Sequence, residues 1–224
     1  LLTDHAITAI MFQLAKKYKI RNVLSGANIS TESGMPPEWL WNKSDKTNIV
    51  DIHRRFGSVP IKTFPTMSAW KWYSIRIFKY FNFFRPLNQI EYNLYDAIQK
   101  LEDEFGWKYY GGKHYESVFT RFYQAYVLPN KFGVDKRRAH FSSLIRSKAL
   151  FREKALEEVS RPIMDAEQLE HDKVYVLKKL GFSDEEFHAI MNAPPCAHLD
   201  YKSSQHIINM FSSLRPMYKR VTRE

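Results

Sequence analysis

A short apolar run that ends in a turn of small residues constrains the fold of this chain most strongly. Val23-Leu24 forms the run, and Ser25-Gly26-Ala27-Asn28 makes the turn. In parallel α/β sheets, ligands bind just outside the carboxyl ends of strands, where the chain turns toward the next helix. Neither Ser25 nor Gly26 has a large side chain to keep a ligand from the backbone. The pattern alone predicts a strand, a turn and a capped helix, and it also suits a ligand-binding turn.

The segments around this turn predict alternating helices and strands. Apolar residues at helical spacing predict a helix over 7–18, and 21–25 follows as a strand buried on both faces. Asp45 is expected to cap a helix that stops at Gly57, and 61–64 reads as a second strand. Asn93 is expected to cap a helix that ends at Phe105, with Gly106 as its stop.

Residues 70–84 are unusually aromatic, with eight aromatic side chains among the fifteen residues. On a helical wheel most of them share one face. We expect one helix over this segment, covered by other parts of the protein or by a partner subunit. A helix that lies in a membrane interface is the alternative.

From Trp107 onward the sequence is mainly helical in pattern. Helices are expected over 142–159, 165–180 and 203–215, and Ser183 with Glu186 predicts a capping box at the start of another. No run of about 18 uncharged apolar residues is present, so no transmembrane segment is expected.

The formal net charge of +10 is unevenly distributed. Residues 52–90 contain seven bases and no acid, and 108–148 is also strongly basic. Such blocks favour an anionic partner. The single cysteine, Cys196, excludes a disulfide framework and a four-cysteine metal site within this chain, which fits a reducing cytoplasm. No metal-ligating residues are predicted.

Two basic motifs could carry chemistry. Lys113-His114-Tyr115-Glu116 follows a double glycine, and Asp135-Lys136-Arg137-Arg138-Ala139-His140 follows Gly133. Arginine and lysine suit phosphate oxygens, and His114 or Glu116 could transfer a proton. A solvated helix start and an exposed basic turn are the simpler readings of the same residues.

Four segments resemble a known family: Leu24–Glu32, Arg85–Asn88, Tyr109–Glu116 and Phe132–His140. The first two resemble the PP-loop ATP pyrophosphatases in general. All four together resemble the C-terminal two-thirds of the bacterial N-acetyl sugar amidotransferases, which act in lipopolysaccharide O-antigen and flagellin-sugar biosynthesis. The Ser-Gly-Gly-x-Asp-Ser loop that defines the superfamily is absent from this sequence. We therefore expect the chain to be a fragment of a longer protein and inactive alone.

The resemblance implies an α/β fold: a partial doubly wound parallel sheet of the PP-loop (HUP-like) type, followed by a mostly helical region. Residues 1–106 would be the C-terminal part of the PP-loop domain, and 107–224 a helical region for substrate and partner. The implied enzyme is a cytoplasmic amidotransferase that uses ATP and Mg²⁺. It converts a sugar N-acetyl group to an acetamidino group, with ammonia from a glutaminase partner. Its substrate would be an anionic sugar or nucleotide sugar.

The resemblance also assigns roles to residues of this sequence. The expected catalytic residues are Lys113, His114, Glu116, Arg137 and Arg138. The expected ATP-binding residues are Ser25, Gly26, Asn28 and Glu32. The expected substrate-binding residues are Tyr115, Arg121, Lys136 and His140.

Two other functions fit parts of the sequence. A tRNA-modifying PP-loop thiolase would explain the basic charge by RNA binding, but the chain lacks cysteines for sulfur chemistry, so no nucleic-acid partner is favoured. A non-catalytic docking module would use the aromatic segment 70–84 to hold a partner.

Overall fold

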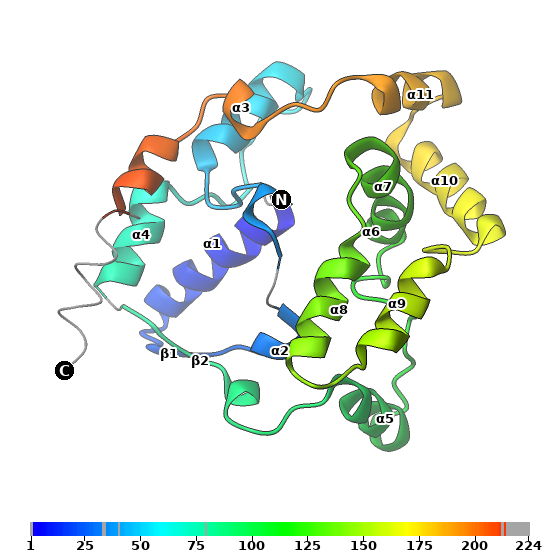
Figure 1. Ribbon diagram of the computed structural model, residues 1–224. Helices are drawn as coiled ribbons and strands as arrows, with labels where there is room; N and C mark the ends of the chain where they lie inside the picture. The colour runs from blue at the N-terminus through cyan, green and yellow to red at the C-terminus, as the bar shows by residue number, and fades with distance from the viewer. Residues whose placement is uncertain (1, 33–34, 40, 79, 212, 214–224) are drawn as a thin grey trace. The chain divides into compact units, whose positions relative to one another are not determined.

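The chain is mostly helical. The computed structural model describes residues 2–32, 35–39, 41–78, 80–211 and 213. It is 61% helical and 3% strand (Figure 1). None of the helices in the described residues is long and apolar enough to cross a bilayer.

The chain divides into two compact units that interleave along the sequence. The first comprises residues 1–25, 40–84 and 196–224, and the second comprises 26–39 and 85–195. The predicted domain boundary between 106 and 107 stays a prediction.

Within the described residues, the first unit contains both strands, three labelled α-helices and a further helical segment over 205–211. Its elements are α1 Leu2–Lys17, β1 Asn22–Leu24, α3 Lys46–Phe56, α4 Ala69–Ile77, β2 Asn82–Phe84 and the short η4 His198–Asp200. The core of this unit forms where α1 meets α4, around buried Ala9, Phe12, Met67 and Ile75. Asp45 caps α3 and Gly57 ends it, as the sequence predicts.

The second unit is a set of helices. They are α2 Ile29–Glu32, η1 Pro37–Trp39, η2 Pro86–Asn88, α5 Leu94–Phe105, α6 Val118–Phe122, the π-helix η3 Tyr123–Val127, α7 Leu128–Phe132, α8 Lys136–Arg146, α9 Arg152–Ser160, α10 Ala166–Leu180 and α11 Asp184–Asn192. Its core gathers Phe122, Val176, Leu177 and Phe187. The predicted bounds of α5 and the capping box of α11 are confirmed.

The predicted doubly wound sheet is wrong. The described residues contain two strands, β1 and β2, which pair in parallel with Val23 opposite Phe83. The predicted strand 61–64 is irregular in the structure. The prediction that β1 is buried on both faces is also wrong, since Leu24 is 73% exposed.

The predicted helix over 70–84 is wrong in its second half. Helix α4 ends at Ile77, and residues 82–84 form β2 instead. Aromatic side chains favour strands, and Pro86 disfavours helical geometry at Arg85. The predicted helix over 142–159 is likewise interrupted: α8 ends at Arg146, and Lys148 adopts a left-handed φ of 61° before α9.

A buried carboxylate holds the first unit together. The Asp45 side chain is fully buried. Its Oδ2 accepts hydrogen bonds from Ser203 Oγ at 2.6 Å, the Ser204 amide at 2.9 Å and His198 Nε2 at 3.1 Å. Burial raises the pKa of the Asp45 carboxyl, but these hydrogen bonds outweigh it and hold the pKa below its usual value. The charged form is therefore the one that joins residues 198–204 to the start of α3.

We predict that Asp45→Asn lowers the free energy of unfolding by about 2–3 kcal/mol at pH 7, because the amide nitrogen cannot accept these bonds. A carboxyl with a depressed folded-state pKa stabilises the protein above its unfolded pKa of about 3.9 and loses that contribution as the pH falls further. The penalty should therefore shrink below about pH 4.

Urea denaturation from pH 3 to pH 7 measures this penalty. Asp96→Asn, the same change at an exposed position on α5, is the control and should cost a few tenths of a kcal/mol. A penalty for Asp45→Asn that equals the control would contradict the role of this carboxylate.

Candidate functional site

The candidate site is built around α2, a helix of four residues. A helix this short leaves nearly all of its backbone N–H and C=O groups without intrahelical partners. Asn28, which is 7% exposed, supplies the first replacement. Its Oδ1 accepts hydrogen bonds from the Thr31 amide at 2.8 Å and from the Thr31 hydroxyl at 3.1 Å. The turn that precedes α2 therefore also caps it.

The Arg85–Asn88 segment supplies the second partner of α2. The Oδ1 atom of Asn88 accepts a hydrogen bond from the amide of Ile29 at 2.9 Å. The two residues are 59 positions apart in the sequence. Two of the four resemblance segments therefore meet at the start of this helix.

The Tyr109–Glu116 segment supplies the third partner. Lys113 Nζ donates a hydrogen bond to the carbonyl oxygen of Thr31 at 2.8 Å. Gly112 allows this loop to close, because a β-carbon built there would lie 2.7 Å from the Tyr115 ring. The buried Gln124 side chain donates to the Lys113 carbonyl at 3.3 Å, so the π-helix η3 fixes the loop from the other side.

The Phe132–His140 segment reaches the same place through α8, which packs against α2 (Figure 1). Helix α8 carries Lys136, Arg137, Arg138 and His140. All four segments that carry the resemblance therefore gather around α2, although the first ends at Glu32 and the last begins at Phe132, 100 positions later in the sequence.

Two of the predicted cationic residues are occupied by internal contacts. The Arg137 guanidinium bonds to the Asp135 carboxylate and to carbonyl oxygens at the end of α9, among them Glu158 at 2.9 Å and Arg161 at 3.0 Å. Arg121 makes two hydrogen bonds of 2.7 Å to the fully buried Asp172. Arg137 therefore joins α8 to the end of α9, and Arg121 joins α6 to α10.

The remaining candidates differ in exposure. His114 has a left-handed backbone conformation with φ of 65°. Its Nδ1 atom lies 3.7 Å from Glu116 Oε1, and both side chains are more than half exposed. Arg138 is exposed on α8, and within the described residues its guanidinium makes no hydrogen bond or ion pair. Lys136 and His140 are half-buried on α8. Arg138, His114 and Glu116 are therefore the candidates that solvent, and hence a ligand, can reach.

Tyr115 lies among the charges of the two basic motifs. Burial raises the pKa of its hydroxyl, the nearby Arg137 and Arg121 act to lower it, and Asp135 acts to raise it. The net direction is upward, so the Tyr115 hydroxyl stays protonated and can donate a hydrogen bond.

The structure describes three of the four predicted ATP-binding residues in full and only the backbone of the fourth, Glu32. The Ser25 amide donates to the carbonyl of Phe84 at 2.9 Å, which extends the pairing of β1 and β2. A β-carbon built on Gly26 would meet no atom within 4 Å, so the turn has open space beside it. Glu32 ends α2, but its side chain lies outside the described part of the chain.

Three residues of the site are absent from the sequence-based assignment. Thr31 and Asn88 lie inside the segments that carry the resemblance. Thr31 takes part through its backbone carbonyl and Asn88 through the cap that it gives to Ile29, and no residue spacing predicts such contacts. Gln124 had one signal: it is a polar residue within the aromatic run from Phe122 to Tyr126. Among the described residues, no group of three or more His, Cys, Asp or Glu could hold a metal ion.

A family model matches part of this chain. Residues 116–215 match the family model described as the LPS biosynthesis protein WbpG-like, C-terminal domain. The match includes α8 and all of the Phe132–His140 segment. Searches of curated proteins and of solved structures found no match.

We predict that Arg121→Met lowers the free energy of unfolding by about 3–5 kcal/mol at pH 7, because it leaves the Asp172 carboxylate buried without its cation. The Arg121 hydrogen bonds, against the opposing effect of burial, lower the pKa of Asp172. The pair's contribution is therefore present above an unfolded pKa of about 3.9 and lost as the pH falls through the folded value.

Guanidinium denaturation of the parent protein and of Arg121→Met between pH 3 and pH 7 tests the Arg121–Asp172 ion pair. Arg146→Met, at an exposed position on α8, is the control and should change stability by less than about 0.5 kcal/mol. A cost for Arg121→Met that stays constant down to pH 3 would argue against the ion pair.

Arg137 and Arg138 should respond differently to the same substitution. We expect Arg137→Ala to cost about 2–3 kcal/mol of unfolding free energy, since Asp135 and the end of α9 lose their donor. Arg138→Ala should cost less than about 0.5 kcal/mol. Thermal melts of the two variants side by side measure the difference, and equal melting temperatures would refute it.

Proposed function

We propose that this chain takes part in lipopolysaccharide biosynthesis, and that its reaction is the ATP-dependent conversion of a sugar N-acetyl group to an acetamidino group. The WbpG-like match over residues 116–215 supports the first part. The convergence of four resemblance segments around α2 is the observation that carries the second, because chain segments far apart in sequence gather where a shared ligand would contact all of them.

The proposed reaction has two steps. The amide oxygen of the sugar acetamido group attacks the α-phosphorus of ATP, and the bond to the β-phosphate oxygen breaks and releases pyrophosphate. Ammonia then attacks the activated carbon, the carbon–oxygen bond breaks, and AMP leaves with the former amide oxygen. The net change consumes ATP and ammonia and yields AMP, pyrophosphate and the acetamidino sugar.

The residues around α2 fit parts of this chemistry. The open turn at Gly26 and the buried Asn28 suit the adenosine end of ATP. The exposed Arg138 guanidinium suits the negative charge that develops on departing pyrophosphate. The His114–Glu116 pair is accessible and suits the proton that the attacking ammonia must lose.

The fit to ATP is incomplete within this sequence. The Ser-Gly-Gly-x-Asp-Ser loop that cradles phosphates in the PP-loop superfamily is absent. We therefore assign only the adenosine side and the leaving-group side of ATP to this chain, and we propose that Mg²⁺ arrives bound to the triphosphate. The cytoplasmic location and the ammonia-supplying glutaminase partner belong to the same proposal.

Isotope labelling in the full-length protein tests the proposal. The sugar substrate carries ¹⁸O in its acetyl carbonyl, and ammonia is supplied as ¹⁵N-ammonium chloride. We expect mass spectrometry to find ¹⁸O in AMP and ¹⁵N in the sugar. Label that appears in inorganic phosphate with ADP, or that remains in the sugar, would contradict the adenylation step.

Arg138→Ala tests the proposed role of that residue in the same assay. We expect a loss of about 2–4 kcal/mol in transition-state stabilisation, seen mainly as a lower kcat, with little change in KM for the sugar. Arg146→Ala, on the same helix, is the matched control. An unchanged kcat for Arg138→Ala would show that this residue has no catalytic role.

A further inference from the structure

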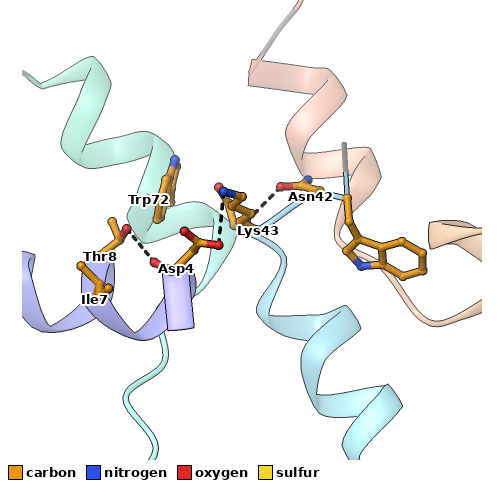
Figure 2. A pocket seen from close by; sticks show the side chains of 8 residues that line it. Asp4, Ile7, Thr8, Asn42, Lys43 and Trp72 are labelled. Atoms are coloured by element: carbon orange, nitrogen blue, oxygen red, sulfur yellow. Dashed lines mark hydrogen bonds and ion pairs between the residues drawn. The ribbon is translucent and has the colours of Figure 1, made fainter. Parts of the chain in front are cut away.

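A separate pocket lies in the first unit, between the start of α1, residues 41–44 and α4 (Figure 2). Its volume is about 470 Å³, within the range of roughly 300–1,000 Å³ that is usual for small-molecule sites. Two tryptophans, Trp41 and Trp72, line it together with Asp4, Thr8, Asn42 and Lys43. None of these residues is a candidate for the reaction proposed above.

The polar side of the pocket offers both hydrogen-bond donors and acceptors. Asp4 Oδ2 lies 3.2 Å from Lys43 Nζ, and both side chains are about half exposed. Figure 2 shows these two groups facing each other. The half-buried Asn42 adds an amide, and its Oδ1 accepts the Ser44 amide at 3.0 Å. The opposite charges of Asp4 and Lys43 cancel, so the lining has no net charge.

The wall formed by residues 41–44 is held in place by buried hydrogen bonds. The fully buried His5 ring lies 2.7 Å from the Lys43 carbonyl through Nδ1, and its Nε2 accepts the Met67 amide at 3.0 Å. Because a backbone amide can only donate, Nδ1 carries the proton and donates to Lys43. Trp41 Nε1 donates to Asn48 Oδ1 at 2.9 Å, which orients the indole.

The opposite wall is equally fixed. Trp72 packs against the core of the first unit, and its ring meets Phe12 edge-on with centroids 6.1 Å apart. Both tryptophans are half-buried. The Trp41 ring also packs against the His198 ring, with centroids 5.0 Å apart. A pocket with rigid walls loses little conformational entropy when a ligand binds.

We propose that this pocket binds a saccharide in its pyranose form. A pyranose ring has an apolar C–H face, which suits the indole surfaces, and a rim of hydroxyls that each both donate and accept hydrogen bonds. The carboxylate of Asp4, the ammonium of Lys43 and the amide of Asn42 match that rim. A nucleotide also stacks on tryptophan, but its phosphates need an excess of positive charge, which the lining lacks.

The five tryptophan indole N–H groups give a direct test in the full chain. The ¹⁵N-labelled protein is titrated with methyl pyranosides, including N-acetylated ones, and separately with AMP and ATP. We expect saturable shifts of the indole signals of Trp41 and Trp72, with Trp39, Trp70 and Trp107 unmoved. Saturation transfer from the protein should be strongest to the protons of the C–H face of the sugar.

Two conservative variants test the polar rim. Asp4→Asn and Lys43→Met should each weaken sugar binding about tenfold, as expected for one lost hydrogen bond to a charged group. Lys16→Met, on an exposed position of α1, should bind the sugars like the parent protein. The indole spectrum of each variant without ligand shows that the fold is kept.

Three results would overturn the proposal: no indole shift with any sugar, equal shifts of all five indoles, or shifts of Trp41 and Trp72 with nucleotides alone. Sugar binding here does not involve ATP. The site therefore stands or fails independently of the acetamidino reaction.

Discussion

The unmet hydrogen bonds of α2 are the constraint on which the candidate site depends. Four residues cannot satisfy their own backbone as a helix, so α2 exists only where other segments supply partners. Asn28 caps the Thr31 amide, Asn88 accepts from Ile29, and Lys113 donates to the Thr31 carbonyl. Each partner comes from a different segment of the family resemblance. The same bonds that hold the helix therefore bring these segments, and α8 beside them, to one place.

The basic residues of the site fall into two groups that the sequence alone cannot separate: those bonded to carboxylates and those exposed to solvent. Arg121 and Arg137 are half-buried and bonded to Asp172 and Asp135, so they join helices. Arg138, the immediate neighbour of Arg137, is exposed. Consecutive helix positions point about 100° apart, which is why adjacent arginines in one basic run serve different ends. A net charge of +10 describes the field of the molecule, but it does not say which cations are available to a ligand.

Local signals in the sequence were sufficient for many helices and insufficient for the sheet. Asp45, Asn93 and Ser183 mark helix starts through bonds to amides within three residues, so these elements could be predicted. The pairing of β1 with β2 joins residues 60 positions apart, and no local pattern encodes it. The site followed the same rule: the segments were recognisable, whereas the bonds of Asn88, Gln124 and Asp172 depend on tertiary packing.

A double-mutant cycle between Asn88→Ala and Lys113→Met tests whether α2 joins the segments of the site. Asn88 binds the Ile29 amide of α2, and Lys113 binds the Thr31 carbonyl. If one substitution already releases the helix, the second should lower the free energy of unfolding by much less than it does alone. We expect the combined loss of unfolding free energy to be smaller than the sum of the two single losses by more than about 0.5 kcal/mol. The pair Asn88→Ala and Lys100→Met, with Lys100 exposed on α5, should be additive. Additive costs for Asn88 and Lys113 would contradict α2 as the shared centre of the site.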